Sequence, residues 1–261
     1  MRRGLAAAAA LVLLAACAAG GGRSQAVQDQ DGRLLAKAIQ DLSTGGASFN
    51  LDEQVTLTGG DIPAGQSAAV HGQASGSLVQ GHIGMTYKFL RGKTNPVFDV
   101  IVADGGFYIR QHGGSQWLVT PEPAATELYP AVRLDLMRES VLLAERVDAS
   151  SLARIGNGLD FAHKYVVKPA PDQLEQLDAM PVQGAAETAF LKSASAEFDV
   201  FLSVQGDRLM RIEVHITGTD PDTGTKQKID SVADFKPAKV KPIDAPSGAT
   251  PVSPNQIFGG G

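Results

Sequence analysis

Alternation of apolar and polar residues at every second position is the feature that most constrains this fold. Between residues 49 and 57, polar side chains stand between the apolar ones, and this period of 2 is typical of a β-strand with one buried and one wet face. Glu53 is the single polar residue on the apolar side. The apolar members of the run are Phe49, Leu51, Val55 and Leu57.

The same alternation recurs along the chain and predicts a meander of antiparallel strands. Turn residues separate the runs at 80–82, 104–106, 205–207 and 219–224. Residues 104–106 read Asp-Gly-Gly, which is a hairpin signal. In the second run, Gly72 and Gly76 stand between the apolar positions. The alternating apolar residues are Val70, Ala74 and Leu78; Ile83, Met85, Tyr87 and Phe89; Phe98, Val100 and Val102; Phe107 and Ile109, followed by 117–119; Leu159, Phe161, Tyr165 and Val167; Phe198, Val200, Leu202 and Val204; Ile212, Val214 and Ile216; and a last short run in 229–235.

Three segments instead show apolar residues at helical spacing. Residues 33–42 predict a short amphipathic helix that ends at 43–46. Residues 124–147 predict a helical insertion between the two sets of strands, continued over 151–155, and residues 172–180 predict another short helix. The apolar positions of the first two segments are Leu34, Leu35, Ala38, Ile39 and Leu42, and then Leu134, Met137, Val141, Leu142 and Ala144.

A sheet with one apolar face must cover that face with a second sheet or with helices. Here the strands are many and the helices few. We therefore predict an α+β fold in which a strongly curved antiparallel sheet, a half-barrel, is covered on its concave face by a few helices. A few helices seldom fill a wide concave surface, so a cavity could remain.

The first residues have the layout of a secretory signal peptide. Arg2 and Arg3 precede an apolar run over 5–16, which is too short to span a bilayer. The segment Leu14-Ala15-Ala16-Cys17 resembles the bacterial lipobox, in which the cysteine thiol receives diacylglycerol and becomes the new N-terminus. The alternative is an ordinary signal peptide with an incidental cysteine. Cys17 is the only cysteine, so the fold contains no intramolecular disulfide.

Cleavage after residue 16 would leave 245 of the 261 residues, and the net charge of −5 would become −7 once Arg2 and Arg3 leave. This charge argues against nucleic acid or anionic headgroups as electrostatic partners. We divide the chain into a signal peptide at 1–16, a lipidated N-terminus and flexible tether at 17–32, one domain at 33–235, and a tail at 236–261, rich in Pro and Gly, that is extended or disordered.

The sequence resembles a family, the envelope lipoproteins LppX, LprA, LprF and LprG, which share the fold of the lipoprotein carrier LolA. The resemblance covers most of the mature chain. It rests on the lipobox, the opening helix, the first strands, residues 104–109 followed by Trp117, the central helices, and the closing stretch 231–246. It implies a half-barrel whose concave face and helices enclose a cavity for acyl chains.

Candidates for the cavity lining are apolar residues at the alternating positions that face inward, especially aromatic residues and Met. The Met side chain adapts to variable shapes. The alternative for each of them is a plain core residue. The candidates are Phe49, Leu51, Val55, Leu57, Ile83, Met85, Tyr87, Phe89, Phe107, Leu134, Met137 and Val141.

No catalytic or metal motif stands out. The five histidines lack the short spacing of a metal site, no serine lies in a Gly-x-Ser-x-Gly elbow, and residues 220–224 lack the glutamate and spacing of an EF-hand, which favours a simple turn. We expect no enzyme activity, no cofactor and no metal ligand.

The leading hypothesis is a lipoprotein without catalytic activity, tethered to the extracytoplasmic face of the cell membrane. It would bind lipid acyl chains in an apolar cavity and take part in lipid transport across the cell envelope. Its partners would be lipid acyl chains, the membrane itself through the N-terminal diacylglycerol, and an envelope lipid transporter. The competing hypothesis is a non-catalytic structural module with a solid core that binds other envelope proteins.

Overall fold

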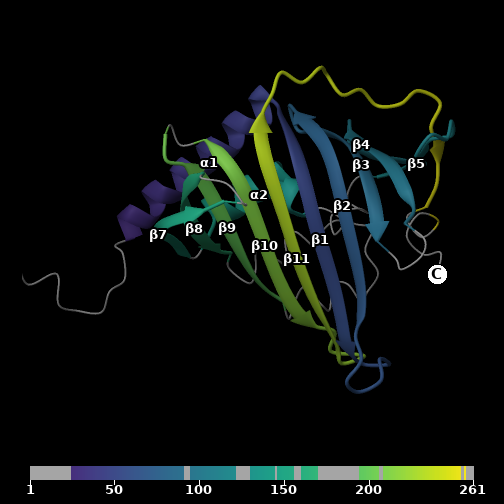
Figure 1. Cartoon of the computed structure of the whole chain (residues 1–261), viewed down its shortest axis with the longest axis horizontal. Helices are drawn as coiled ribbons and strands as arrows, with labels where there is room; N and C mark the ends of the chain where they lie inside the picture. Colours follow the sequence, from purple (N-terminus) through teal and green to yellow (C-terminus); the bar gives the residue numbers. More distant parts are fainter. Residues whose placement is uncertain are drawn as a thin grey trace, which may run out of the picture.

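The computed structural model describes residues 25–90, 95–121, 130–144, 146–155, 160–169, 194–205, 208–253 and 256. The predicted signal peptide, Cys17 and the predicted helix at 172–180 lie outside these residues. Within them, the chain forms one open, curved sheet that carries two α-helices on one side (Figure 1). The predicted curved antiparallel sheet with a few helices is confirmed at this level.

The sheet has 12 strands in the spatial order β12-β6-β5-β4-β3-β2-β1-β11-β10-β9-β8-β7. Neighbouring strands pair antiparallel, except β12, which runs parallel to β6. The strands are β1 (Ala47–Gly59), β2 (Ala68–Val79), β3 (His82–Leu90), β4 (Val97–Ala103), β5 (Gly106–Gln111), β6 (Leu118–Pro121), β7 (Arg146–Arg154), β8 (Phe161–Lys168), β9 (Ser195–Ser203), β10 (Leu209–Thr219), β11 (Thr225–Pro237) and β12 (Thr250–Pro251).

Two consecutive meanders, β1–β6 and β7–β11, join at the centre of the sheet through β1 and β11. These two strands pair along their full length, from Ala47 opposite Pro237 to Gly59 opposite Thr225. Both predicted tight hairpins are present: Gln80 and Gly81 connect β2 to β3, and Asp104 and Gly105 connect β4 to β5. All four residues have positive φ, which fits two-residue turns of type I′.

Helix α1 (Gln25–Gly45) contains the predicted helix at 33–42 but begins eight residues earlier. The predicted tether at 17–32 is therefore too long, because residues 25–32 are helical. The inward stripe of α1 is Leu35, Ala38, Ile39 and Leu42, all buried. The helix ends at Gly46, whose φ of 87° and N–H bond to the carbonyl of Leu42 (3.0 Å) form a left-handed C-cap.

The predicted helical insertion is shorter than expected. A 3-10 turn (Pro130–Val132) leads into α2 (Leu134–Leu142), and the chain then becomes strand β7. The helical prediction for 143–147 and 151–155 is thus wrong where β7 forms. The reason is tertiary: β7 pairs with β8 at the edge of the sheet, with an irregularity between Ala149 and Leu152, and this pairing overrides local spacing.

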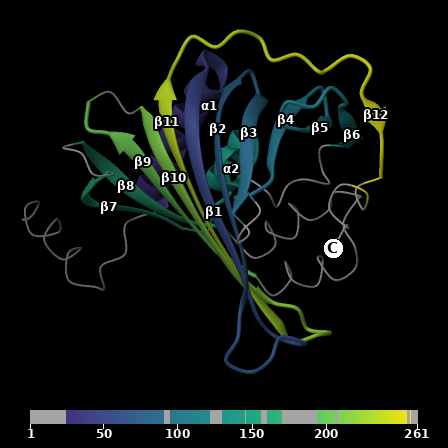
Figure 2. The ribbon, with the colours of Figure 1, turned by 45° about the vertical axis from the view of Figure 1, so that its right-hand side comes forward.

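The residues after β11 are held in place by contacts with other elements. The predicted start of the tail at 236 is therefore too early. Strand β11 continues to Pro237, and the N–H of Ala238 then donates to the carbonyl of Gly46 (3.1 Å). Further on, the carbonyl of Ile243 accepts a hydrogen bond from Nδ1 of His82 (2.8 Å). The chain crosses the top of the sheet and reaches β6 as the short strand β12 (Figure 2).

Candidate functional site

The inner face of the sheet is apolar, as the alternation predicts. The burial of β1 alternates along its first half, so Phe49, Leu51 and Glu53 all point inward. The helices cover this face unevenly. Within the described chain, α1 mainly contacts α2, β2, β7, β9 and β10, whereas α2 mainly contacts α1 and the 3-10 turn. Neither helix therefore packs mainly against the inner face of β3–β5.

That part of the inner face carries a group of seven large side chains, which we call the aromatic group. Its rings contact one another: Tyr87 and Phe89 have centroids 4.7 Å apart, and Phe89 and Phe98 meet edge to face at 5.8 Å. The group encloses a pocket of about 10 Å³, roughly the room of one water molecule. The members are Met85, Tyr87, Phe89, Phe98, Val100, Phe107 and Ile109.

Two glycines on β2 make room for this group. A Cβ atom at Gly72 would lie 1.8 Å from the Tyr87 hydroxyl oxygen. A Cβ atom at Gly76 would lie 2.3 Å from the carbonyl oxygen of Gly84 and 2.7 Å from Cβ of Met85. Because β2 presents no side chain at these positions, the long side chains of β3 can lie over it. This explains the glycines that interrupt the apolar face of the second run.

Next to the aromatic group lies the one acidic side chain on the inner face of β1. Tyr87 reaches across β2 and donates its hydroxyl to Oε1 of Glu53 (3.2 Å). Oε2 of Glu53 has no hydrogen-bond partner, and Ser231 stands directly opposite on β11. Burial raises the pKa of Glu53 well above its ordinary value, and the bond from Tyr87 offsets this only in part. Burial and Glu53 likewise raise the pKa of Tyr87.

A wider pocket of about 410 Å³ adjoins the aromatic group at the edge of the sheet. Phe98 and Ile109 line both pockets and therefore lie at the boundary between the two spaces. Both residues are only partly buried. The rest of the wider pocket is more polar, and nearby the Arg110 guanidinium lies 4.5 Å from the Trp117 ring centroid. The other lining residues are Arg110, Gln111, Gly114, Ser115, Gln116, Leu118 and Gln256.

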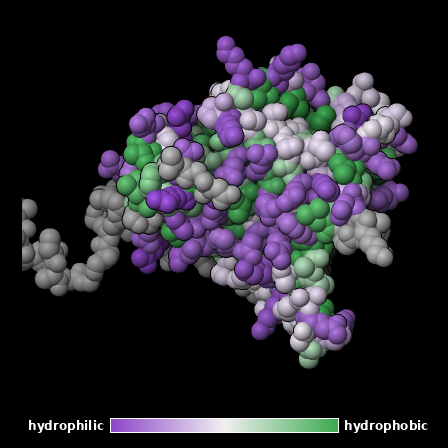
Figure 3. Space-filling model, in the orientation of Figure 1, coloured by the Kyte–Doolittle hydropathy of each residue, from purple (hydrophilic) through white to green (hydrophobic). Residues whose placement is uncertain are grey.

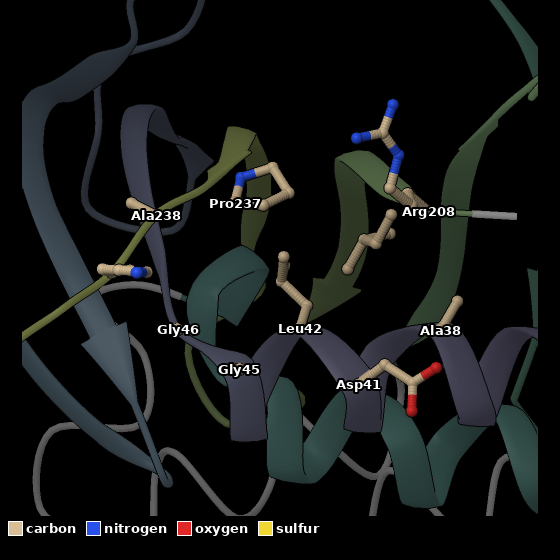
Figure 4. Close-up of a pocket in the computed structure, with 10 residues that line it drawn as sticks. Ala38, Asp41, Leu42, Gly45, Gly46, Arg208, Pro237 and Ala238 are labelled. Atoms are coloured by element: carbon tan, nitrogen blue, oxygen red, sulfur yellow. The ribbon is translucent and has the colours of Figure 1, made fainter. Parts of the chain in front are cut away.

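A third pocket, of about 460 Å³, lies at the other end of the inner face, where α1 ends (Figure 4). Its apolar part comes from Ala38 and Leu42 on α1 and from Leu209 at the start of β10. Leu42 points across the space toward Pro237, while Arg208 lies at the rim. Both wide pockets fall within the 300–1,000 Å³ typical of small-molecule sites.

The structure describes all twelve residues that were predicted to line the cavity. Most belong to the buried core, Phe89 is packed against it, and Val55 and Leu57 are half-buried outside the core cluster. Met85, Tyr87, Phe89 and Phe107 meet in the aromatic group, but none of the twelve candidates lines either wide pocket. Phe98, Val100 and Ile109 were missed as candidates, although the alternation places them on the same face as Phe107.

Comparisons with known proteins give structural likenesses only. No protein-family model and no curated protein sequence matches the chain. The structure is similar to that of LprF from Mycobacterium bovis, with a TM-score of 0.45 and 12% identity, covering 87% of this chain and 100% of that one. LprF is one of the lipoproteins that the sequence resembles.

Two further likenesses are weaker. An uncharacterized conserved protein from Thermus thermophilus has a TM-score of 0.37 and 11% identity, covering 85% of this chain and 98% of that one. A β-barrel-like protein of domain of unknown function DUF1849 from Brucella abortus has a TM-score of 0.24 and 9% identity, over 75% and 100%. All these TM-scores lie below 0.5, so function must be inferred from the residues of this chain. Within the described ranges, no helix has the length and apolarity needed to cross a membrane.

Proposed function

We propose that this chain is a membrane-anchored lipoprotein of LolA-like half-barrel fold that binds lipid acyl chains on the inner face of its sheet and takes part in lipid transport across the cell envelope. The observation that carries the proposal is the aromatic group. Two of its members, Phe98 and Ile109, also line a neighbouring pocket of about 410 Å³.

The closed state of the aromatic pocket suits a site that opens for its ligand. A volume of about 10 Å³ admits no acyl chain, so the side chains must move when one enters. Met85 is unbranched and adaptable, and Phe89, Phe98 and Ile109 are only partly buried. An acyl chain entering from the wider pocket would displace these three side chains first.

The energetics of transfer favour an all-apolar site. Each buried CH₂ gains about 0.8 kcal/mol over water, so a lipid with roughly thirty chain CH₂ groups gains on the order of 25 kcal/mol. A bilayer offers nearly the same gain, and exchange between membrane and protein is then almost balanced. A carrier requires such a balance, because a much better pocket would never release its lipid.

The proposed anchor holds the domain close to the membrane. If Cys17 carries diacylglycerol, the eight residues from Cys17 to the start of α1 at Gln25 span at most about 28 Å when fully extended. The inner face can then exchange lipid with the membrane that holds the anchor, and a transporter in that membrane would be the natural partner. The proposal involves no catalytic step, no cofactor and no nucleic acid.

One observation favours the alternative function, a solid-core module that binds other envelope proteins. The aromatic pocket is nearly filled by the protein's own side chains. The two functions differ in what the purified protein contains, and organic extraction followed by mass spectrometry distinguishes them.

The test uses the full chain carrying Cys17→Ala, so that the acyl groups of the anchor do not contribute to the extract. Carrier function predicts about one lipid per chain. Extracts without lipid, together with no uptake of a fluorescent fatty acid from vesicles, would contradict it. In the unsubstituted chain, metabolic labelling with a radioactive fatty acid should mark the protein, and the label should disappear in Cys17→Ala.

A further inference from the structure

The outer face of the sheet carries a cluster of charged side chains across β8–β11. Alternation turns Asp199 on β9 outward, together with Glu213 and His215 on β10. Asp199 and Glu213 stand directly opposite each other in the β9–β10 register. The outer face is the one seen in Figure 3, where hydrophilic residues dominate over the central strands.

These three side chains converge. One possible ligand atom from each of Asp199, Glu213 and His215 lies within 4.8 Å of those of the other two. Asp199 is only 4% exposed, because β9 is buried on both faces from Phe198 to Ser203. Its Oδ1 is a buried carboxylate oxygen without a hydrogen-bond partner, and such an atom requires an explanation.

Each member of the cluster has one atom bound to a neighbour and another that remains for a ligand. The Lys164 ammonium pairs with Oδ2 of Asp199 (2.5 Å), which leaves Oδ1. Arg211 donates to Oε1 of Glu213 (3.2 Å), which leaves Oε2. Nδ1 of His215 bonds to Oδ1 of Asp230 (2.8 Å), which leaves Nε2.

The bond between His215 and Asp230 has the form found around metal-binding histidines. When Nδ1 donates its proton to a carboxylate, the tautomer is fixed and Nε2 presents a lone pair. Lys228 pairs with the other oxygen of Asp230 (2.7 Å) and holds this carboxylate in place. Asp230 therefore acts as a positioning residue for His215.

We propose that Asp199, Glu213 and His215 form a binding site for a divalent transition-metal cation of the Zn²⁺ class. Two carboxylates and one imidazole are a donor set that Zn²⁺ accepts, and a fourth position remains for water. The site lies on the face opposite the aromatic group, and a bound cation would link β9 to β10. This inference is independent of lipid binding.

Other histidine–carboxylate pairs on the same face show what distinguishes this cluster. His71 bonds to both oxygens of Asp52, and Gln73 donates to one of them. At Asp99, Oδ1 and Oδ2 are both bonded as well, to His112 and Arg110 respectively. Neither carboxylate retains an unbonded buried oxygen in the way Asp199 does. His71 is therefore a matched control.

The test is a calorimetric titration of the full chain with Zn²⁺. The protein carries Cys17→Ala, which removes the only thiol, and has no oligohistidine tag. We expect one site per chain in this parent protein. His215→Gln and Asp199→Asn should each weaken Zn²⁺ binding by at least about tenfold, and Asp230→Asn by about tenfold through loss of positioning. His71→Gln should leave the affinity unchanged.

A second measurement separates lost binding from lost folding. The His215 side chain is 38% exposed, so His215→Gln should fold normally, with an unchanged melting temperature in chelator. Added Zn²⁺ should raise the melting temperature of the parent protein and not that of His215→Gln. The proposal is overturned if the parent protein binds no Zn²⁺ at millimolar concentration, if His215→Gln binds as the parent does, or if His71→Gln loses as much affinity.

Discussion

The inner face of the sheet is covered in two different ways. On β9–β11, small and aliphatic side chains such as Val200, Ile212 and Val214 are fully buried in the same cluster as the inward stripe of α1. On β3–β5, the large side chains of the aromatic group contact one another, and three of its members, Phe89, Phe98 and Ile109, are only partly buried. The same strand alternation thus produces a fully buried face in one half and a partly exposed one in the other. What differs is where the two helices lie.

The largest expected effect falls on the helix-covered half. Ile39 is fully buried on the inward stripe of α1, so Ile39→Ala should lower the free energy of unfolding by about 2–5 kcal/mol. Chemical denaturation measures this. Lipid recovered per folded chain should stay the same. A variant that kept its stability would show that α1 is loosely packed, and it would contradict the difference drawn between the two halves of the inner face.

Next comes the hydrogen bond at the border between the halves. Tyr87→Phe removes the donor to Glu53 and leaves that buried carboxyl without a partner, which should cost about 1–3 kcal/mol of unfolding free energy. Tyr108→Phe, on the outward side of β5, serves as the control. Equal denaturation midpoints for Tyr87→Phe and the parent would mean that the bond contributes nothing.

Added bulk at the boundary between the two pockets should act on lipid rather than on stability. Ile109 lines both, so Ile109→Trp should reduce the lipid recovered by mass spectrometry by about tenfold, equivalent to about 1.4 kcal/mol. Tyr108→Trp adds bulk to the opposite face of the same strand and should change nothing. Full lipid content in Ile109→Trp would place the acyl chain elsewhere.

The last effect concerns pH, and it is a slope rather than a single difference in free energy. Since the folded-state pKa of Glu53 is raised, the folded protein binds more protons than the unfolded chain at pH values above about 4.5. The contribution of this residue to stability is therefore complete below that pH and decreases as pH rises toward the folded-state pKa, by up to about 1.4 kcal/mol per pH unit. Glu53→Gln should flatten this slope in denaturation curves recorded from pH 4.5 to 8. Parallel curves for the two proteins would mean that Glu53 ionises normally.

The strands were predictable because one buried face leaves a period of 2 in the sequence. Strand β1, its exceptional Glu53, and the turns at Gln80 and Asp104 all follow from that pattern and from turn chemistry. Strand β7 was not predicted, since the alternation of its apolar residues is interrupted between Ala149 and Leu152, and pairing with β8 makes it a strand. The order of residues 238–253 comes from contacts with β3 and β6 and with the end of α1, which lie far away in sequence.

By itself, the sequence determined an antiparallel sheet with one apolar face and few helices to cover it, while the secretory start with a lipobox-like cysteine stays a prediction. These are local properties, written in the spacing of residues along one strand or helix. The tertiary structure alone decided which inward side chains meet as the aromatic group and which outward ones converge at Asp199. Both depend on the register between strands, and no single strand carries that information.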